Sequence, residues 1–358
     1  MNYVAIMAGG IGSRFWPASR VEKPKQFHDI LGVGKSLLRL TFERFLGLVP
    51  AERIYVITNE GYRSLVKEHL PELSDDQILG EPSRNNTAPS VAWMAFRLKA
   101  MDPNANFVIA PSDHVILKEK EFLVNIRRAL DFTVENEALC TLGIQPTRPD
   151  TGYGYIHYDK KEVAEGGIHK VLEFVEKPDL ATARSYLESG NYLWNAGIFI
   201  WRAETILNEF RKQAPGVYEI LAKGEGLYGT RDEKQFISEN YPKTQNISVD
   251  FAILEKAGNV YTIPSDIGWS DLGTWASLQE ELPKTDTGNV LQGDKIVALD
   301  VTNSLIRGGK EKLMVIKGLK DYIVVDEGDV LLIWPKNEEQ AIKSIRQELE
   351  ARFGKDFF

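Results

Sequence analysis

The sequence contains one cysteine, few histidines and no excess of positive charge. The lone Cys140 excludes an intrachain disulfide and a cysteine-based zinc site, and its apolar neighbours predict a buried strand residue. The five histidines show no His-x-x-x-His spacing. Lysine and arginine number 43 against 51 aspartates and glutamates, which gives a net charge of −8. A chain with this balance lacks the basic footprint that nucleic-acid or anionic-membrane binding needs.

Long apolar runs are also missing. Stretches such as 330–334 are too short for a transmembrane helix, and no basic region precedes the first glycines, which argues against a signal peptide. We therefore expect a cytoplasmic protein that binds neither membrane nor nucleic acid. Hydrophobic residues make up 43% and charged residues 26% of the chain, as is ordinary for a globular protein. At roughly 150 residues per domain, this length predicts two domains or one large domain with an appendage.

Short apolar strands alternate with helical patterns in the first part of the chain. The expected strands are 3–7, 53–58, 106–110 and 138–143, and the expected helices are 37–49, 62–70, 88–101 and 122–135. This alternation predicts βαβ units and a mainly parallel sheet, hence an α/β fold. In the middle, strands at 154–158 and 168–175 flank a charged turn and predict a hairpin. A strand at 195–201 and helices at 204–210 and 272–282 follow.

The tail changes character after about residue 288. Short strands are expected at 294–300, 304–306, 312–316, 322–326 and 330–334, before a closing helix at 338–352. Turn and polar residues gather near 283–288, so we divide the chain into a domain at 1–285 and a small β-rich domain at 286–358. The tail is predicted to support self-association rather than chemistry, because its strands leave edges that need cover.

The strongest local feature is the run Ala8-Gly9-Gly10-Ile11-Gly12-Ser13-Arg14, directly after the first strand. Glycines let backbone N–H groups approach an anion closely, and phosphate is the usual anion at such a place. The run is not a dinucleotide fingerprint, whose last glycine would fall on Phe15, and it is not a Walker A loop. Four basic residues and one acid lie between 14 and 25. This local excess favours a pyrophosphate or triphosphate pocket over a simple tight turn.

The segment after the glycines carries a resemblance. Ala-Gly-Gly-x-Gly-x-Arg is followed by Trp16-Pro17-x-Ser19-Arg20 and Lys23-Pro24-Lys25-Gln26-Phe27. This pattern resembles the signature of sugar-1-phosphate nucleotidyltransferases, and its Pro-Lys-Gln-Phe ending is most similar to the mannose-1-phosphate guanylyltransferases. The resemblance extends to about residue 335. It implies that the nucleotide is bound by Ala8, Gly9, Gly10, Gly12, Ser13, Arg14 and Lys25, with Arg14, Lys25 and the loop amides holding the leaving pyrophosphate.

Two aspartates are candidate metal ligands. Asp113 lies just past the expected strand at 107–110, and ligands of open α/β sheets bind at the carboxyl ends of strands. Asp271 precedes the expected helix at 272–282, where it could equally be an N-cap. Two carboxylates with phosphate oxygens and waters are a usual way to hold Mg²⁺. The resemblance favours the metal role for both aspartates, with Asp113 also on the nucleotide side and Asp271 also on the sugar-phosphate side.

The base and sugar motifs follow from the same resemblance. Glu81, Asn86 and Thr87 match the base loop, although Arg84 and Asn85 depart from the Gly-Arg that usually precedes the asparagine, so which of the two contacts the nucleotide stays open. The sugar-phosphate motifs contribute Gly152 and Tyr153, then Glu176 and Lys177, then Asn195. From the residues alone, Glu176 and Lys177 could be a solvated strand end, Asn195 a turn residue, and Thr87 an N-cap.

The resemblance also implies a fold, a reaction and an assembly. The fold would be a Rossmann-like nucleotidyltransferase domain with a short left-handed β-helix after it, which helps homodimers form. The reaction would convert GTP and α-D-mannose 1-phosphate into GDP-mannose and pyrophosphate, with Mg²⁺. Longer relatives carry an isomerase barrel, and because this chain ends at Phe358 we expect that second activity to be absent.

Two alternatives stay open. The first is a nucleotidyltransferase for another pair, such as UTP or dTTP with glucose 1-phosphate. The second is a non-catalytic nucleotide-sugar sensor, which would be expected to lack Lys25 or a metal aspartate. An NAD-dependent oxidoreductase is disfavoured by the missing third glycine.

Overall fold

A nine-stranded mixed sheet forms the centre of the larger part of the molecule. The coordinates are a computed structural model, and the structure describes residues 1–164, 166–309 and 311–358. Glu165, in the predicted charged turn, lies outside them. The sheet strands are β1 (Asn2–Met7), β2 (Ile54–Asn59), β3 (Ile78–Glu81), β4 (Asn106–Pro111), β6 (Leu139–Ile144), β7 (Tyr155–Ala164), β8 (Ile168–Val175), β9 (Tyr192–Arg202) and β10 (Val260–Pro264).

The sheet runs in the order β3-β2-β1-β4-β9-β6-β10-β8-β7. Neighbours are parallel from β3 to β4 and between β6 and β10, and antiparallel where β9 meets β4 and β6. The prediction of a mainly parallel sheet is therefore wrong for the second half. The predicted hairpin is confirmed as β7 and β8. Strand β9 therefore runs against the direction of β4 and β6, and it also pairs antiparallel with β7.

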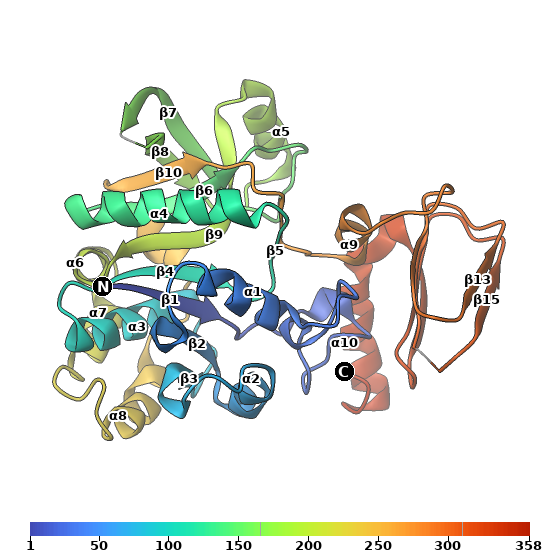
Figure 1. The fold of residues 1–358 in the computed structure, drawn as a ribbon, viewed down its shortest axis with the longest axis horizontal. Helices are drawn as coiled ribbons and strands as arrows, with labels where there is room; N and C mark the ends of the chain where they lie inside the picture. Colours follow the sequence, from blue (N-terminus) through green and yellow to red (C-terminus); the bar gives the residue numbers. More distant parts are fainter. Residues whose placement is uncertain (165, 310) are drawn as a thin grey trace. The chain divides into compact units, whose positions relative to one another are not determined.

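Helices cover both faces of this sheet (Figure 1). Tyr3 and Ala5 of β1 belong to the buried core that also contains residues of α3, α6 and α7, whereas Val4 and Ile6, which are equally buried, point to the other face because side chains alternate along a strand. The helices of this part are α1 (Leu37–Leu46), α2 (Arg63–His69), α3 (Thr87–Met101), α4 (Glu119–Glu135), α5 (Leu180–Ser189), α6 (Ala203–Gln213), α7 (Pro215–Ala222) and α8 (Glu233–Asn240). Burial on both faces explains the near-continuous apolar strands.

The chain divides into two compact units, each made of separate segments. The first, the sheet unit, contains residues 1–9, 41–112 and 116–269, and the second, the loop unit, contains 10–40, 113–115 and 270–358. The short strands β5 (Val115–Ile116) and β11 (Trp269–Ser270) lie where the chain passes from one unit to the other. The boundary predicted at 285/286 stays a prediction; the unit that includes 286–358 also includes most of the glycine-rich run.

The loop unit has its own core, in which the segment after the glycine-rich run meets the C-terminal residues. Phe15 and Trp16 pack there with Trp275 of α9 (Trp275–Glu281) and with Phe358. The rings of Trp16 and Phe358 stack with centroids 5.6 Å apart, and Trp16 Nε1 donates to the Phe357 carbonyl at 2.8 Å. The other elements of this unit are β12 (Val290–Gln292), β13 (Ile296–Leu299), β14 (Leu305–Arg307), β15 (Met314–Lys317), β16 (Tyr322–Asp326), β17 (Leu331–Pro335) and α10 (Ile342–Phe353).

The tail strands form two small sheets. One has the order β12-β14-β16-β17 and the other pairs β13 with β15; all these pairs are parallel except β16 with β17. Buried Ile306, Met314 and Val324 pack with Val301 in a core of their own. Leu291 pairs with Ile306, and Ile333 pairs with Val324, so these residues form one row across the sheet. Leu291 and Ile333, at the two ends of this row, are exposed.

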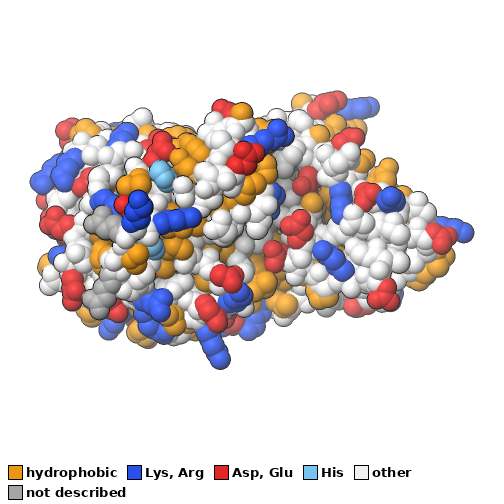
Figure 2. Space-filling view, turned by 90° about the horizontal axis from the view of Figure 1, so that it is seen from above, with side chains coloured by type: hydrophobic (Ala, Val, Ile, Leu, Met, Phe, Trp, Pro, Cys, Tyr) orange, Lys and Arg blue, Asp and Glu red, His pale blue; other side chains and the backbone are white. Residues whose placement is uncertain are grey.

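The surface carries mixed charge. On the face seen in Figure 2, lysine and arginine alternate with aspartate and glutamate, and apolar side chains lie among them. That face shows no broad field of one sign, in keeping with the overall balance of charge. Among the described residues, no helix combines the length and the apolar character needed to cross a membrane.

Candidate active site

The glycine-rich run forms a tight loop that only glycine fits at its centre. Gly12 has φ +65°, and a Cβ atom added there would lie 2.5 Å from Lys25 Cβ. Ser19 Oγ donates to the Ile11 carbonyl at 2.6 Å, and Gln26 Nε2 donates to the Gly10 carbonyl at 3.0 Å. The predicted basic segment therefore packs directly on the loop, which we call the glycine loop (residues 8–14).

A cavity of about 320 Å³ lies against this loop. Its walls come from all three segments of the loop unit and include four of the predicted site residues, Arg14, Lys25, Asp113 and Asp271. The full lining is Gly12, Ser13, Arg14, Phe15, Lys25, Asp113, His114, Asp271, Leu272, Gly273 and Lys343. We call this space the phosphate cavity. The structure thus brings together the residues predicted to bind phosphate and metal, and it adds His114 and Lys343.

Lys25 links the two aspartates. Its buried ammonium lies 3.1 Å from Asp113 Oδ2 and donates to the Asp271 carbonyl at 2.8 Å. Burial pushes the pKa of Asp113 upward, but the positive charge of Lys25, aided by His114, outweighs it and leaves the pKa below its usual range. Asp113 is therefore ionised at neutral pH, as a metal ligand must be.

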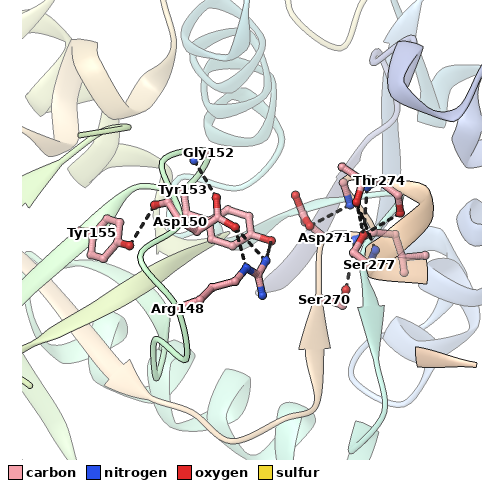
Figure 3. Close-up of polar contacts among 11 residues, drawn as sticks. Arg148, Asp150, Gly152, Tyr153, Tyr155, Ser270, Asp271, Thr274 and Ser277 are labelled. Atoms are coloured by element: carbon pink, nitrogen blue, oxygen red, sulfur yellow. Dashed lines mark hydrogen bonds and ion pairs between the residues drawn. The ribbon is translucent and has the colours of Figure 1, made fainter. Parts of the chain in front are cut away.

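Asp271 does not cap the helix that follows it. The N-cap of α9 is Thr274, whose hydroxyl accepts from the Ser277 amide at 3.2 Å while Ser277 Oγ accepts from the Thr274 amide (Figure 3). Asp271 Oδ1 instead accepts from the Gly273 amide at 2.9 Å, and helix α9 begins at Trp275, later than predicted. The N-cap explanation of Asp271 is wrong.

The donor set of the phosphate cavity fits a hard divalent cation. Asp113 and Asp271 both line it, and carboxylate oxygens are the ligands that Mg²⁺ prefers. The described residues contain no cluster of three or more histidine, cysteine or acidic side chains that would hold a metal by themselves. Two carboxylates agree with the usual coordination of Mg²⁺, which binds one or two carboxylates and completes its coordination shell with phosphate oxygens and water.

Glu81, the predicted base-binding acid, lies at the end of β3 in the sheet unit. Its Oε1 accepts from the hydroxyls of Ser90 and Tyr241, and burial raises its pKa above the usual range despite these hydrogen bonds. A Cβ atom added to Gly9 would lie 3.2 Å from Glu81 Oε2. The second carboxylate oxygen thus lies beside the start of the glycine loop.

The rest of the base loop separates into structural and exposed residues. Asn85 is buried, and its amide donates to the carbonyls of Tyr241 and Thr244 at 3.1 and 2.9 Å. Arg84 stays exposed, with one guanidinium nitrogen donating to Tyr62 Oη at 2.9 Å. Of these two departures from the family pattern, Asn85 is a structural residue and Arg84 is the one accessible to a ligand.

Asn86 and Thr87 anchor the start of helix α3. Asn86, at φ 65°, is the N-cap and accepts from the Thr87 amide at 2.9 Å. The Thr87 hydroxyl accepts from the Val249 amide at 2.8 Å. Asn86 rather than Thr87 therefore caps the helix, and the nucleotide roles of both residues stay predictions.

The predicted sugar residues converge within the sheet unit. A Cβ atom added to Gly154 would lie 2.6 Å from Glu176 Oε2 and 3.3 Å from Asn195 Cβ. Glu176 is largely buried and pairs with the ammonium of Lys177, whose side chain is 57% exposed. The structure therefore brings Glu176 and Asn195 together on either side of the glycine, and a fully solvated strand end is wrong for Glu176.

The orientation of the Asn195 amide is fixed by its neighbours. Oδ1 accepts from Thr141 Oγ1 at 3.1 Å and from the Gly197 amide at 3.0 Å, while Nδ2 donates to Asp250 Oδ1 at 3.1 Å. Both lone pairs of Oδ1 are used, so Asn195 can offer a ligand only its second N–H. The remaining acceptor oxygens of this cluster belong to Glu176 and Asp250.

Asp250 lies in the same cluster as Glu176 and Asn195, and the sequence analysis did not single it out. Burial, followed by the nearby Glu176 carboxylate, raises its pKa to about 7, although Lys177 and Asn195 counteract the shift. It begins a short π-helical turn over Asp250–Leu254. The only signal in the sequence is one acid at the head of an apolar run, a pattern that is typical of an ordinary helix cap.

Gly152 and Tyr153 belong to a loop organised by Asp150 (Figure 3). Asp150 Oδ1 accepts from the Gly152 amide at 2.8 Å, and its carbonyl accepts from Tyr155 Oη at 2.9 Å. Arg148 forms an ion pair with Asp150 and lies over the Trp194 ring, 5.2 Å from its centroid. The sequence analysis singled out neither Arg148 nor Asp150, because their role depends on side-chain packing.

The Tyr153 ring contacts two tryptophans in the same unit. Its centroid lies 5.0 Å from that of Trp194 and 5.3 Å from that of Trp269. The predicted sugar-face aromatic is thus held by packing before any ligand arrives.

A second cavity, of about 370 Å³, lies between β3, α3 and α8 of the sheet unit. Three of the four basic residues that line it are held by the protein: Arg97 pairs with Glu233 and Lys234 with Glu60, and Arg63 donates to the carbonyls of Ile78 and Asp75. None of the predicted site residues lines this second cavity, whereas Arg14, Lys25 and both aspartates line the phosphate cavity.

Comparison with known proteins identifies relatives over almost the whole chain. The profile of the nucleotidyl transferase family matches residues 3–288. A mannose-1-phosphate guanylyltransferase of Escherichia coli K12 is 36% identical over 358 residues, which cover 98% of this chain and 73% of that protein. One from Salmonella muenchen is 37% identical over 351 residues, covering 97% and 73%.

A solved structure agrees with these relatives. It is described as a mannose-1-phosphate geranyltransferase from Thermus thermophilus and superposes with a TM-score of 0.86 at 30% identity, covering 98% of this chain and 99% of that one.

Proposed function

Because the chain belongs to the nucleotidyl transferase family, we propose that it transfers GMP from GTP to α-D-mannose 1-phosphate. The products are GDP-mannose and pyrophosphate. The observation that carries the proposal is the phosphate cavity, in which the glycine loop, Arg14, Lys25 and two aspartates share one lining. The names of the relatives supply the mannose and guanine specificity.

The chemistry asked of the protein is positioning and charge neutralisation. A phosphate oxygen of the sugar phosphate attacks the α-phosphorus of GTP, a new P–O bond forms, and the bond to the β-phosphate oxygen breaks with its electron pair leaving on pyrophosphate. The attacking oxygen is already anionic, so no strong base is needed. Arg14 and the loop amides bind the departing pyrophosphate.

Asp113 and Asp271 are the residues that would hold Mg²⁺, which when bound offsets the charge on the phosphates. Lys25 keeps both aspartates in place through its contacts with the Asp113 carboxylate and the Asp271 carbonyl. Its ammonium also favours the ionised form of Asp113, which is the form that binds metal.

Guanine selectivity is assigned to Glu81. A carboxylate can accept two hydrogen bonds from the N1–H and N2 amino group of guanine, whereas uracil and thymine offer one ring N–H and adenine offers none. Oε1 is held by Ser90 and Tyr241, and Oε2 lies beside Gly9. Because Ser90 and Tyr241 use both acceptor positions of Oε1, Oε2 is the oxygen left to accept from the guanine donors.

We also propose that the tail forms a short β-helix that contributes to a homodimer. The parallel strand pairs of the tail support the β-helix. Exposed Val297, Val315 and Ile333 provide apolar surface that a second subunit could cover.

The reaction is tested by measuring pyrophosphate release and nucleotide-sugar formation for GTP, ATP, UTP and dTTP, each with mannose 1-phosphate and glucose 1-phosphate. We expect GTP with mannose 1-phosphate to give the highest kcat/KM. Faster turnover of UTP or dTTP with glucose 1-phosphate would overturn the specificity and leave only the reaction class. No turnover with any pair, while nucleotide sugars still bind, would indicate a sensor.

A further inference from the structure

The last helix of the chain reaches the phosphate cavity. Helix α10 begins at Ile342, which is fully buried in the core of the loop unit with Phe15 and Trp16. The next residue, Lys343, lines the phosphate cavity together with Arg14 and Lys25. The sequence analysis assigned the tail to self-association and placed no functional residue there.

The position of Lys343 is fixed by contacts on both sides of it. Arg346, one turn further along α10, lies over the Phe358 ring, 5.8 Å from its centroid. Phe358 in turn stacks on Trp16, which follows the glycine loop by two residues. Because Ile342 and Arg346 tie the helix to the same core that supports the loop, the helix backbone places Lys343 at the cavity wall.

The charges of the cavity show why a further cation matters. Lys25 is committed to the Asp113 carboxylate and the Asp271 carbonyl, so much of its charge is already balanced. Within the described parts of the chain, Arg14 and Lys343 have neither an ion-pair nor a hydrogen-bond partner for their side chains. An anionic ligand in this cavity would meet these two cations first.

We propose that Lys343 is a phosphate-binding residue that, with Arg14, binds the triphosphate end of the nucleotide and the pyrophosphate it releases. The proposal deepens the proposed function and depends on it. A lysine ammonium is a compact point charge on a flexible stem, suited to a group whose charge increases as the bond to the α-phosphate breaks. The tail then contributes directly to the phosphate site as well as supporting the loop.

The test measures pyrophosphate binding by calorimetry, in the presence of Mg²⁺, and the KM values of the forward reaction. Lys343→Ala is expected to weaken pyrophosphate binding and to raise the KM for GTP by about tenfold, the usual effect of losing one charge-assisted hydrogen bond. The KM for the sugar phosphate should change less than twofold. Lys343→Arg should restore most of the affinity, because it keeps the charge.

Matched controls separate this role from a structural one. Lys355→Ala removes an exposed lysine just beyond the same helix and outside the cavity lining, and it should leave pyrophosphate binding unchanged. The melting temperature should be the same for all variants, since alanine is a good helix former. Lys343→Gln provides a second variant in which the side chain is uncharged.

The outcomes distinguish this proposal from the proposed function. Pyrophosphate affinity of Lys343→Ala within twofold of wild type would overturn the role of Lys343 while leaving the reaction intact. Wild-type protein that binds pyrophosphate, with Lys343→Ala weakened, but that forms no nucleotide sugar would overturn the reaction and support the phosphate site. Wild-type protein that binds no pyrophosphate would overturn both.

Discussion

The two compact units hold their polar groups differently. In the loop unit, Arg14 and Lys343 line a cavity without ion-pair partners among the described residues. In the sheet unit, the amide of Asn195 and one carboxylate oxygen of Glu81 are already hydrogen-bonded by the protein. Uncommitted charge suits the phosphates, which are the same in every nucleotide. Groups oriented in advance suit the base and the sugar, whose donors and acceptors differ between substrates.

If this comparison holds, substitutions in the phosphate cavity of the loop unit should lower turnover for every substrate pair. Substitutions of the oriented polar groups of the sheet unit should instead change selectivity between substrates. The largest effect is expected for Asp271→Asn. Losing a charge that stabilises the transition state commonly costs ~10²–10³ in turnover. Thermal stability should change little, because Thr274 rather than Asp271 caps α9.

Thr274→Ala is the matched variant for that experiment. Loss of the cap should lower the free energy of unfolding by about 1 kcal/mol and leave turnover at saturating Mg²⁺ close to wild type. Near-normal turnover of Asp271→Asn would leave Asp113 as the single protein ligand and remove the two-aspartate site.

A smaller but still general loss is expected from Gly12→Ala. The new Cβ would meet Lys25 Cβ at 2.5 Å, at a residue with φ +65°, and such strain costs of order 1–3 kcal/mol. Turnover should fall for all nucleotides in parallel. Gly10→Ala, which has no atom within 4 Å of its added Cβ, should be mild, and equal effects of the two variants would contradict the packing of the loop on Lys25.

Glu81→Gln tests selectivity in the sheet unit. The amide oxygen can still accept from Ser90 and Tyr241, but an N–H₂ donor then replaces Oε2 and meets the guanine N1–H and amino group with another donor. The ratio of kcat/KM for GTP over UTP should fall by about 10- to 100-fold, as expected when a hydrogen-bonded site loses its match to the substrate. An equal loss for GTP and UTP would show that Glu81 supports the fold rather than selecting the base.

The smallest effect is expected from Asp250→Asn and concerns pH. The folded-state pKa of Asp250 is raised to about 7, above the value of about 3.9 for an unfolded aspartate. Ionisation therefore costs stability, and this cost grows between pH 4 and 7 and stays constant above. Asp250→Asn removes the cost while keeping an acceptor for Asn195.

We therefore expect Asp250→Asn to melt about 5 °C above wild type at pH 8, and the difference to shrink towards pH 5. A stability gap for Asp250→Asn that widens as the pH falls would contradict a raised pKa.

Local patterns predicted many elements well. The hairpin of β7 and β8 was predicted from its two strand patterns, although β7 continues to Ala164 through polar residues that were predicted to form the turn. Helix α3 was predicted because its apolar residues follow Thr87. Strand β3 was missed because Ile78–Glu81 is only four residues long and contains glycine. The antiparallel insertion of β9 depends on its pairing with β4 and β6, which are distant along the chain.

The sequence by itself determined the residue types that phosphate chemistry requires and their local arrangement. The glycine loop, Lys25 and the two aspartates lie in short motifs whose geometry depends on neighbouring residues. Only the tertiary structure decided which residues from distant parts of the sequence come into contact. Asp250 reaches Asn195, and Lys343 reaches the phosphate cavity, because buried side chains such as Ile342 fix their helices. Such contacts leave no periodic pattern in the sequence, because they join segments that share a core but are far apart along the chain.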